Sequence, residues 1–334
     1  MSLKFRSALI ATQAFASVLV VLALFPVDAH AQGDASGYPN KAVRIIVGFT
    51  PGSATDISAR ILAQKFSDAW GVPVTVENTP GAGGAVGAGR GAKAPPDGYT
   101  LLFAANGAMT IAPSLQSKLP YDPTRDFAPI SIAVTAPSIL AVNNDLPVKS
   151  LQELIALVKS QPRIFSYATP GAATPQHIAG ELLKLLAGVD ITHVPYRGAV
   201  FTDVIGGRVP ITLQNAGAIL STVREGRLRG LAVTSLKRSP NMAEFPTVAE
   251  SGFPGFEAVS WFALFAPSGT PATIVGKVHQ EALNVLAQPD VQARFAQLGL
   301  DTVGNSPSEL AAIIKSDIEK WAKVIKDAGI TASE

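Results

Sequence analysis

A loop after a strand carries the residue pattern best suited to binding an anion. Residues 43–49 have the apolar pattern of a buried strand, and residues 57–66 have that of a helix. The loop of residues 50–56 aims backbone N–H groups off a strand end, which is where α/β sheets bind anions. Pro51 has no N–H. The expected donors are the N–H groups of Gly52, Ser53, Ala54 and the next residue or two. Because the loop has no Lys or Arg, the pattern predicts a small polar ligand held by amides, hydroxyls and water.

A second turn, at residues 167–177, repeats this arrangement of strand end, Pro-Gly turn, hydroxyl residues and helix start. A helix N-terminus favours an anion by about 0.3–1 kcal/mol, and by up to about 2 kcal/mol when partly buried. Two such turns facing each other across a cleft could hold the two ends of one dianion. The alternative is that Thr174 only caps its helix. The sequence leaves both interpretations open.

An aromatic and a basic side chain follow another strand of the same region. Tyr196 and Arg197 come after residues 190–194 and could reach the cleft. Arg197 is the best candidate for a direct charge partner of a carboxylate, and the alternative is a surface ion pair with Asp203. His177 is expected to form hydrogen bonds at a helix start rather than to act as a base.

No cofactor, metal site or complete catalytic set is expected. The glycine-rich residues 78–87 invite comparison with a dinucleotide loop, but a G-x-G-x-x-G motif starting at Gly81 would need glycine where Val86 stands. The chain has no G-x-S-x-G, H-E-x-x-H or Walker-type motif. His177 and a neighbouring His193 would need a carboxylate to form a metal site, and the adjacent segments offer none that is obvious. We expect a protein that is not an enzyme. The alternative is a secreted α/β hydrolase-like enzyme that uses Ser53 or His177.

The first 31 residues predict export. Lys4 and Arg6 precede an apolar run at residues 7–27, and Ala29 and Ala31 are the small residues of a cleavage site. We expect cleavage near Ala31 and delivery to the periplasm; the alternative is a membrane-spanning helix. Of 27 basic and 25 acidic residues, 25 and 24 remain after this segment, so no nucleic-acid partner is expected. The absence of cysteine excludes disulfides and thiolate metal sites.

After the signal segment, short apolar strands alternate with helices, which predicts an α/β fold with parallel sheets covered on both faces. The predicted strands are residues 43–49, 72–77, 100–104, 139–143, 165–168, 190–194, 211–214 and 231–234. The predicted helices include residues 57–66, 151–159, 177–186, 201–206, 274–286, 290–298 and 307–328. We expect two lobes, the first of residues 32–135 and 262–334 and the second of residues 136–261. Chain crossings near residues 132–138 and 258–262 would form the hinge of a ligand cleft.

The order of several motifs resembles that of the Bug-type solute receptors of tripartite tricarboxylate transporters. The longest are F-T-P-G-S-A-T-D at 49–56, E-N-T-P-G-A-G-G at 77–84, A-P-P-D-G-Y-T at 94–100, H-V-P-Y-R-G at 193–198, P-T-V-A-E-S-G at 246–252 and A-P-S-G-T-P at 266–271. With shorter motifs between them, they cover essentially the whole chain after the signal segment. Each motif is weakly specific, but the ordered set is highly specific.

The resemblance implies a two-lobed α/β fold like that of type II periplasmic binding proteins. Such a receptor closes on a small organic carboxylate and delivers it to a membrane permease. In the family, the first loop and the second Pro-Gly turn hold the carboxylate, largely through amides and ordered water. The matching positions of this chain are Phe49, Thr50, Ser53, Ala54, Asp56, Thr169, Gly171, Ala172 and Thr174. Tyr196 and Arg197 complete the expected ligand-binding set.

One departure from the family pattern lies in the first loop. The family usually has two glycines after the loop proline, whereas this chain has Gly52 followed by Ser53, which adds a hydroxyl beside the expected carboxylate. We expect Asp56 to cap its helix, orient the loop, or accept a hydrogen bond from an ammonium or hydroxyl group of a ligand. The sequence does not choose between an aliphatic di- or tricarboxylate and an aromatic carboxylate. It also leaves open whether the closed form serves transport or signals to a membrane partner.

Overall fold

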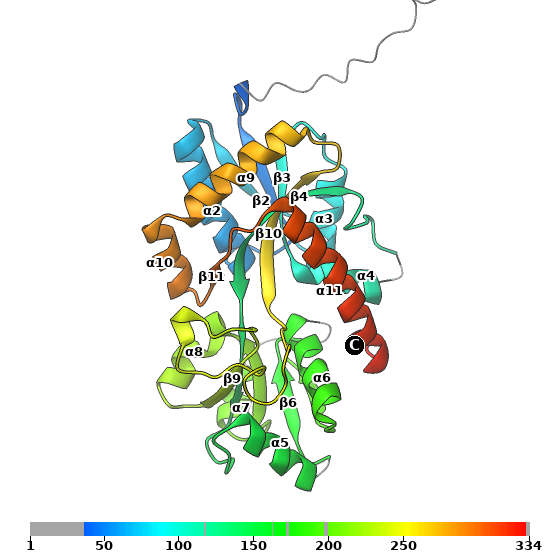
Figure 1. Cartoon of the computed structure of the whole chain (residues 1–334), viewed down its shortest axis with the longest axis vertical. Helices are drawn as coiled ribbons and strands as arrows, with labels where there is room; N and C mark the ends of the chain where they lie inside the picture. The colour runs from blue at the N-terminus through cyan, green and yellow to red at the C-terminus, as the bar shows by residue number, and fades with distance from the viewer. Residues whose placement is uncertain (1–36, 117, 162, 172–173, 197–199, 332–334) are drawn as a thin grey trace, which may run out of the picture. The chain divides into compact units, whose positions relative to one another are not determined.

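The computed structural model describes residues 37–331 except 117, 162, 172–173 and 197–199. The described residues belong to one compact unit, Ala35–Glu334, and form two β-sheets with helices on their faces (Figure 1). The predicted signal segment lies outside the described residues. Within residues 37–331, no described helix is long and apolar enough to cross a membrane.

The first sheet has six strands in the order β11–β4–β10–β3–β1–β2. Its strands are β1 (Val43–Val47), β2 (Val74–Asn78), β3 (Thr100–Ala105), β4 (Phe127–Ala136), β10 (Ser260–Pro267) and β11 (Asp301–Thr302). Strand β1 is parallel to β2 and β3. Strand β10 runs antiparallel between β3 and β4, and β11 is antiparallel to β4. The carboxyl ends of the parallel strands therefore lie beside the start of β10.

Both faces of the first sheet are buried. Ile45 and Val47 pack with α2 (Ala54–Trp70) and α9 (Ala272–Leu286), while Ile46 packs with α3 (Ala85–Ala92) and α11 (Pro307–Asp327). Because successive side chains of a strand point to opposite faces, a strand covered on both sides needs an unbroken apolar run. Residues 45–47 meet this requirement, whereas Arg44 is partly exposed and pairs with Glu77 of β2.

The second sheet has five strands in the order β7–β6–β8–β5–β9. Its strands are β5 (Ser138–Val142), β6 (Ser166–Thr169), β7 (Thr192–Pro195), β8 (Ile211–Asn215) and β9 (Arg229–Val233). Strand β6 is parallel to β7 and β8, and β5 is antiparallel to β8 and β9. One core contains residues of α5 (Leu151–Ser160) and α6 (Pro175–Ala187), and another contains residues of α7 (Val200–Ile205) and α8 (Ala216–Arg224).

Shorter elements connect these layers. They are the 3₁₀ helices η2 (Ala82–Gly84) and η4 (Pro240–Met242), the π-helix η3 (Gly107–Ile111), and the α-helices α4 (Ala112–Leu115) and α10 (Pro289–Gln297). Several helices begin with side-chain caps, as in α11, where Ser306 and Glu309 form a capping box. The predicted strands and helices are observed with their ends moved by a few residues.

The expectation of purely parallel sheets was wrong, because both sheets are mixed. The order of strands and helices along the chain predicts that parallel strands are linked by helices. It does not show that β10 returns from the second sheet to lie antiparallel between β3 and β4. Strand β4 was also not predicted, and its Pro129 is a residue usually confined to strand edges and bulges. A register shift of the β10–β4 pair occurs at this proline, between Leu264 and Phe265.

The chain passes between the sheets at two described places. It leaves the first sheet at Ala136, begins the second at Ser138, and rejoins the first at Ser260. The predicted lobe boundaries and the hinge stay predictions. One observation bears on them: in α11, Leu310 and Ile314 belong to a core of the first sheet, but Trp321 and Val324 belong to a core of the second. The sequence predicts that all of α11 belongs to the first lobe, but its C-terminal half also packs with the second sheet.

Candidate functional site

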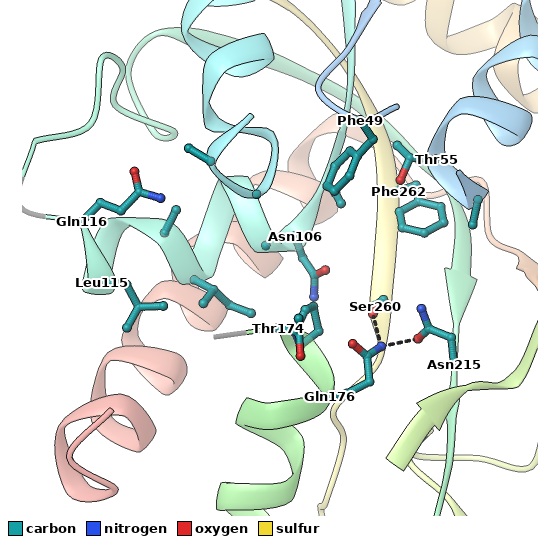
Figure 2. Close-up of a pocket in the computed structure, with 18 residues that line it drawn as sticks. Phe49, Thr55, Asn106, Leu115, Gln116, Thr174, Gln176, Asn215, Ser260 and Phe262 are labelled. Carbon is teal, nitrogen blue, oxygen red and sulfur yellow. Dashed lines mark hydrogen bonds between the residues drawn. The ribbon is translucent and has the colours of Figure 1, made fainter. Parts of the chain in front are cut away.

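A cavity of about 420 Å³ lies at the carboxyl ends of parallel strands from both sheets (Figure 2). Its polar lining side chains include Thr55, Asn106, Thr174, Gln176, Asn215 and Ser260. Phe49, Ile111, Leu115 and Phe262 are prominent among its apolar lining residues. Among the described lining residues, none is charged. Cavities of this size that combine an apolar wall with a few convergent polar groups are typical small-molecule sites.

The first loop is held by hydrogen bonds among its own residues. Asp56 N–H donates to Ser53 Oγ (3.2 Å), and Gly52 N–H donates to Asp56 Oδ2 (2.9 Å). Ser53 N–H donates to Thr50 O (3.2 Å). The N–H groups of the expected donors Gly52 and Ser53 are therefore both used within the loop.

Two other N–H groups of this loop are available at the cavity. Ser53 is the N-cap of α2, so Ala54 and Thr55 are its first two helical residues, whose N–H groups have no acceptor within a helix. Both residues line the cavity. The helix N-terminus that was predicted to favour an anion thus faces the cavity through Ala54 and Thr55.

Asp56 supports this loop from behind. Its side chain is 2% exposed and accepts hydrogen bonds from Arg60 Nε (3.0 Å) and Asn78 Nδ2 (2.8 Å). Burial alone would raise the pKa of Asp56, but hydrogen bonds from Arg60, Gly52 and Asn78 outweigh it and hold the pKa below the usual range. Asp56 therefore orients the loop as an ionised group, which is one of its three expected roles, while Ser53 is the residue that caps the helix.

The glycine-rich segment packs directly against the strand that leads into this loop. A Cβ atom on Gly48 would lie 2.6 Å from Gly84 O, and one on Gly87 would lie 2.6 Å from Gly48 Cα. Ala82 and Gly83 of the same segment line the cavity. The glycines allow a backbone-to-backbone approach that shapes the cavity wall.

The second turn is built around one carbonyl group. Thr169 Oγ1 donates to Gly171 O (3.0 Å), and Thr174 Oγ1 donates to the same oxygen (2.8 Å). Thr174 Oγ1 also accepts from His177 N–H (3.3 Å) and is the N-cap of α6. Thr174 therefore caps its helix, as the alternative interpretation held, and it also lines the cavity.

Two stacked histidines lie behind the second turn. His193 Nε2 is 2.7 Å from Thr169 Oγ1, and the rings of His177 and His193 stack with centroids 3.7 Å apart. Burial, followed by the nearby charge of Lys184, lowers the pKa of His177 to about 4. Burial, followed by the adjacent His177, lowers the pKa of His193 to about 4. Both rings are therefore neutral at neutral pH.

The remaining predicted residues lie apart from the described cavity lining or outside the described residues. Tyr196 OH donates to Asp203 Oδ2 (2.7 Å), and Arg208 pairs with the same carboxylate. Ala172 and Arg197 lie outside the described residues. Of the predicted positions that the structure describes, Phe49, Ala54 and Thr174 line the cavity. Thr50, Ser53, Asp56, Thr169, Gly171 and Tyr196 are not among its described lining residues.

Sequence reasoning missed an amide cluster at the cavity. Gln176 Nε2 donates to Asn215 Oδ1, and the same nitrogen lies 3.5 Å from Ser260 Oγ. This bond turns Asn215 Nδ2 away from Gln176, as Figure 2 shows. Asn215 ends β8, and Asn106 directly follows β3. Both asparagines lie at the end of a buried strand. The rule that singled out residues 50–56 looks for polar residues at that place and would have found both.

The fold and the cavity define a class: two α/β sheets joined by strand crossings, with a polar cavity at their carboxyl edges, are the architecture of a periplasmic solute-binding protein. Comparison with known proteins specifies the family. The model of the tripartite tricarboxylate transporter receptor family matches residues 58–330, so the chain belongs to that family. The resemblance noted from the sequence motifs is confirmed.

Individual relatives agree with this assignment. Protein BugT of Bordetella pertussis is 35% identical over 317 residues, which cover 93% of this chain and 97% of BugT. The structure of R. palustris Rpa4515 with adipate is 34% identical, with a TM-score of 0.76, and the match covers 88% of this chain and 99% of that one. MatC from Rhodopseudomonas palustris with bound malate is 32% identical, with a TM-score of 0.71, and the match covers 86% and 100% of the two chains. The family consists of periplasmic solute-binding receptors.

Proposed function

We propose that this protein captures a small organic carboxylate in the periplasm and delivers it to the permease of a tripartite tricarboxylate transporter. The export signal, cleaved near Ala31, would place the mature chain in that compartment. The observation that supports carboxylate binding most strongly is the pair of N–H groups of Ala54 and Thr55, which begin α2 at the wall of the cavity. Relatives with bound adipate and malate support the same ligand class.

In the proposed complex, the two sides of the cavity have different tasks. One carboxylate accepts hydrogen bonds from the N–H groups of Ala54 and Thr55, while Phe49 covers it. Asn215 Nδ2 contributes a donor from the second sheet. A micromolar dissociation constant requires only about −8 kcal/mol, which a few charge-assisted hydrogen bonds and the exclusion of water can supply.

We also propose that binding closes the two lobes about the crossings near residues 132–138 and 258–262. Contacts between the proposed lobes would hold them in the arrangement seen here. Asp301, in the first, accepts hydrogen bonds from Ser239 Oγ (2.7 Å) and Asn241 Nδ2 (2.9 Å) in the second. A Cβ atom on Gly217 would lie 2.2 Å from Leu298 O, so these backbones also touch. A hinge movement would have to break both contacts.

Thermal unfolding of the chain from Gln32 tests the proposal. The protein is heated with aliphatic and aromatic mono-, di- and tricarboxylates, with amino acids, and with the primary amides of the same acids as controls. At about a thousandfold excess over its dissociation constant, a ligand adds about 4 kcal/mol to the free energy of unfolding and raises Tm by several degrees. A shift with acids but not with their amides supports the proposal. No shift with any acid contradicts it.

Delivery to a permease is tested separately by capture on the immobilised, carboxylate-loaded protein. The membrane subunits of the transporter should be retained more strongly with ligand than without it. Exclusive capture of the ectodomain of a membrane signalling protein would instead favour the sensing alternative.

A further inference from the structure

Asn106 lines the cavity and has a buried hydrogen-bond acceptor. Its side chain is 1% exposed and lines the cavity directly after β3. Asn106 Nδ2 donates to Val259 O (3.1 Å). Because a carbonyl oxygen only accepts, this bond fixes the amide with its nitrogen toward Val259 and its oxygen away from it. Asn106 Oδ1 has no hydrogen-bond partner among the described residues.

A buried acceptor of this kind favours a ligand that donates to it. Leaving a buried polar atom unsatisfied costs about 1–3 kcal/mol, whereas a neutral hydrogen bond contributes about 0.5–1.5 kcal/mol. A hydroxyl or amine group of a ligand satisfies Asn106 Oδ1. A carboxylate cannot, because an ionised carboxylate only accepts hydrogen bonds.

The segment that follows Asn106 provides an apolar wall. The π-helix η3 and the short helix α4 place Ile111, Ala112 and Leu115 in the lining, and Figure 2 shows Leu115 and Gln116 on this side of the cavity. Gln116 is the amide at this end. One neutral amide is a poor substitute for the hydration of a carboxylate, since buried charges in proteins are paired or extensively hydrogen-bonded.

We propose that the preferred ligand has a single carboxylate and an otherwise uncharged, largely apolar body with one hydrogen-bond donor that reaches Asn106 Oδ1. This inference rests on the proposed carboxylate-binding function and narrows its ligand class. It distinguishes this chain from a receptor for dicarboxylates. The first loop binds the carboxylate, Asn106 binds the donor, and η3 with α4 covers the body between them.

The test is a calorimetric titration of the mature protein with two matched series. The aromatic series is benzoate, para-hydroxybenzoate, para-methoxybenzoate and terephthalate. The aliphatic series is hexanoate, its omega-hydroxy derivative and adipate. In the series whose body fits, the hydroxy acid should bind about tenfold more tightly than the parent acid, which corresponds to one satisfied acceptor. The methoxy acid should gain nothing, because it has no proton to donate, and the diacid should bind most weakly.

The variant Asn106→Ala locates the effect. It should reduce the preference for the hydroxy acid over the parent acid to about onefold, and this ratio is the readout because it cancels any loss of affinity common to both acids. The matched control is Asn144→Ala, because Asn144 Nδ2 also donates to a backbone carbonyl, that of Gly226 (2.7 Å), but does not line the cavity. This control should keep the tenfold preference. Wild-type titrations alone decide the ligand class if Asn106→Ala fails to fold.

The outcomes separate this inference from the proposed function. Tightest binding of a diacid, or equal binding of hydroxy and parent acids, would overturn the inference and leave the carboxylate receptor in place. A preference for the hydroxy acid that survives in Asn106→Ala would also overturn it. No binding of any acid by protein with a normal unfolding transition would contradict the proposed function itself.

Discussion

The two turns at the cavity look alike in the sequence but are supported differently. In the first, the ionised Asp56 accepts hydrogen bonds from Gly52, Arg60 and Asn78, and Ala54 and Thr55, the first residues of α2, line the cavity. In the second, two threonine hydroxyls converge on Gly171 O, with neutral histidines behind them. Pro175, the first residue of α6, has no N–H to offer. The comparison teaches that the first turn brings the start of a helix to the cavity, where we propose that the carboxylate binds, whereas the second contributes side chains.

The largest expected effect comes from removing the charge behind the first turn. Asp56→Ala leaves the Gly52 N–H and Asn78 without their acceptor, so the free energy of unfolding should fall by about 4 kcal/mol in urea titrations. Asp290→Ala is the control, because Asp290 forms an exposed pair with Lys65, so its loss should change the free energy of unfolding far less. Since the pKa of Asp56 is lowered in the folded protein, its contribution is present above about pH 4 and is lost as pH falls through the lowered pKa. Equal losses of stability in Asp56→Ala and Asp290→Ala would show that Asp56 supports the first turn no more than an exposed carboxylate would.

The second turn should instead respond to pH through its histidines. Between about pH 6.5 and 4 the unfolded chain binds protons that the folded chain excludes, because the pKa values of His177 and His193 are lowered to about 4. Stability should therefore fall on acidification across this window, by about 3 kcal/mol for one histidine. His177→Phe keeps an aromatic ring beside His193. It should lower the number of protons taken up on unfolding by about one, which makes the slope of the free energy of unfolding against pH shallower. An unchanged slope would show that this pair does not support the turn through its neutral form.

A third prediction concerns the contact between the first strand and the glycine-rich segment. Gly48→Ala places a methyl group against the backbone of Gly84 and should cost about 2 kcal/mol in the free energy of unfolding. Gly276→Ala, in helix α9 with no atom within 4 Å of the new Cβ, should stabilise by about 0.5–1 kcal/mol. Opposite signs are expected, and a neutral Gly48→Ala would mean that the approach is looser than described.

The smallest expected effect tests the cap of the second turn. Thr174→Ala removes both the cap of α6 and one donor to Gly171 O, and should cost about 1 kcal/mol. Thr174→Ser keeps the hydroxyl and should recover most of this loss. Failure of the serine variant to recover it would assign the effect to the methyl group instead.

The sequence predicted the elements and both turns because their signals are local. An apolar run such as residues 45–47 and a cap such as Ser53 are visible within a few residues. The antiparallel return of β10 was not visible, because it depends on contacts between residues far apart in the chain. The hydrogen bond from Gly52 N–H to Asp56 was not visible for a related reason, because it depends on how the loop folds back on its helix.

The site was predicted less completely than the fold. Cavity walls collect residues from many segments, so Gln176, Asn215 and Ser260 come together only after both sheets have formed. Each has an ordinary polar side chain, and its spacing in the sequence carries no motif. Asn106 and Asn215 share one local signal, their place at a strand end, and the same physical rule that marked the first loop applies to them.

The most direct test of the central claim is a crystal structure of the mature protein with the tightest-binding carboxylate of the titration series. The account predicts that a carboxylate oxygen lies within hydrogen-bond distance, about 2.7–3.2 Å, of the N–H groups of Ala54 or Thr55. It also predicts that Asp56 keeps its bond to Gly52. A carboxylate bound elsewhere, with the start of α2 facing an uncharged part of the ligand, would contradict it.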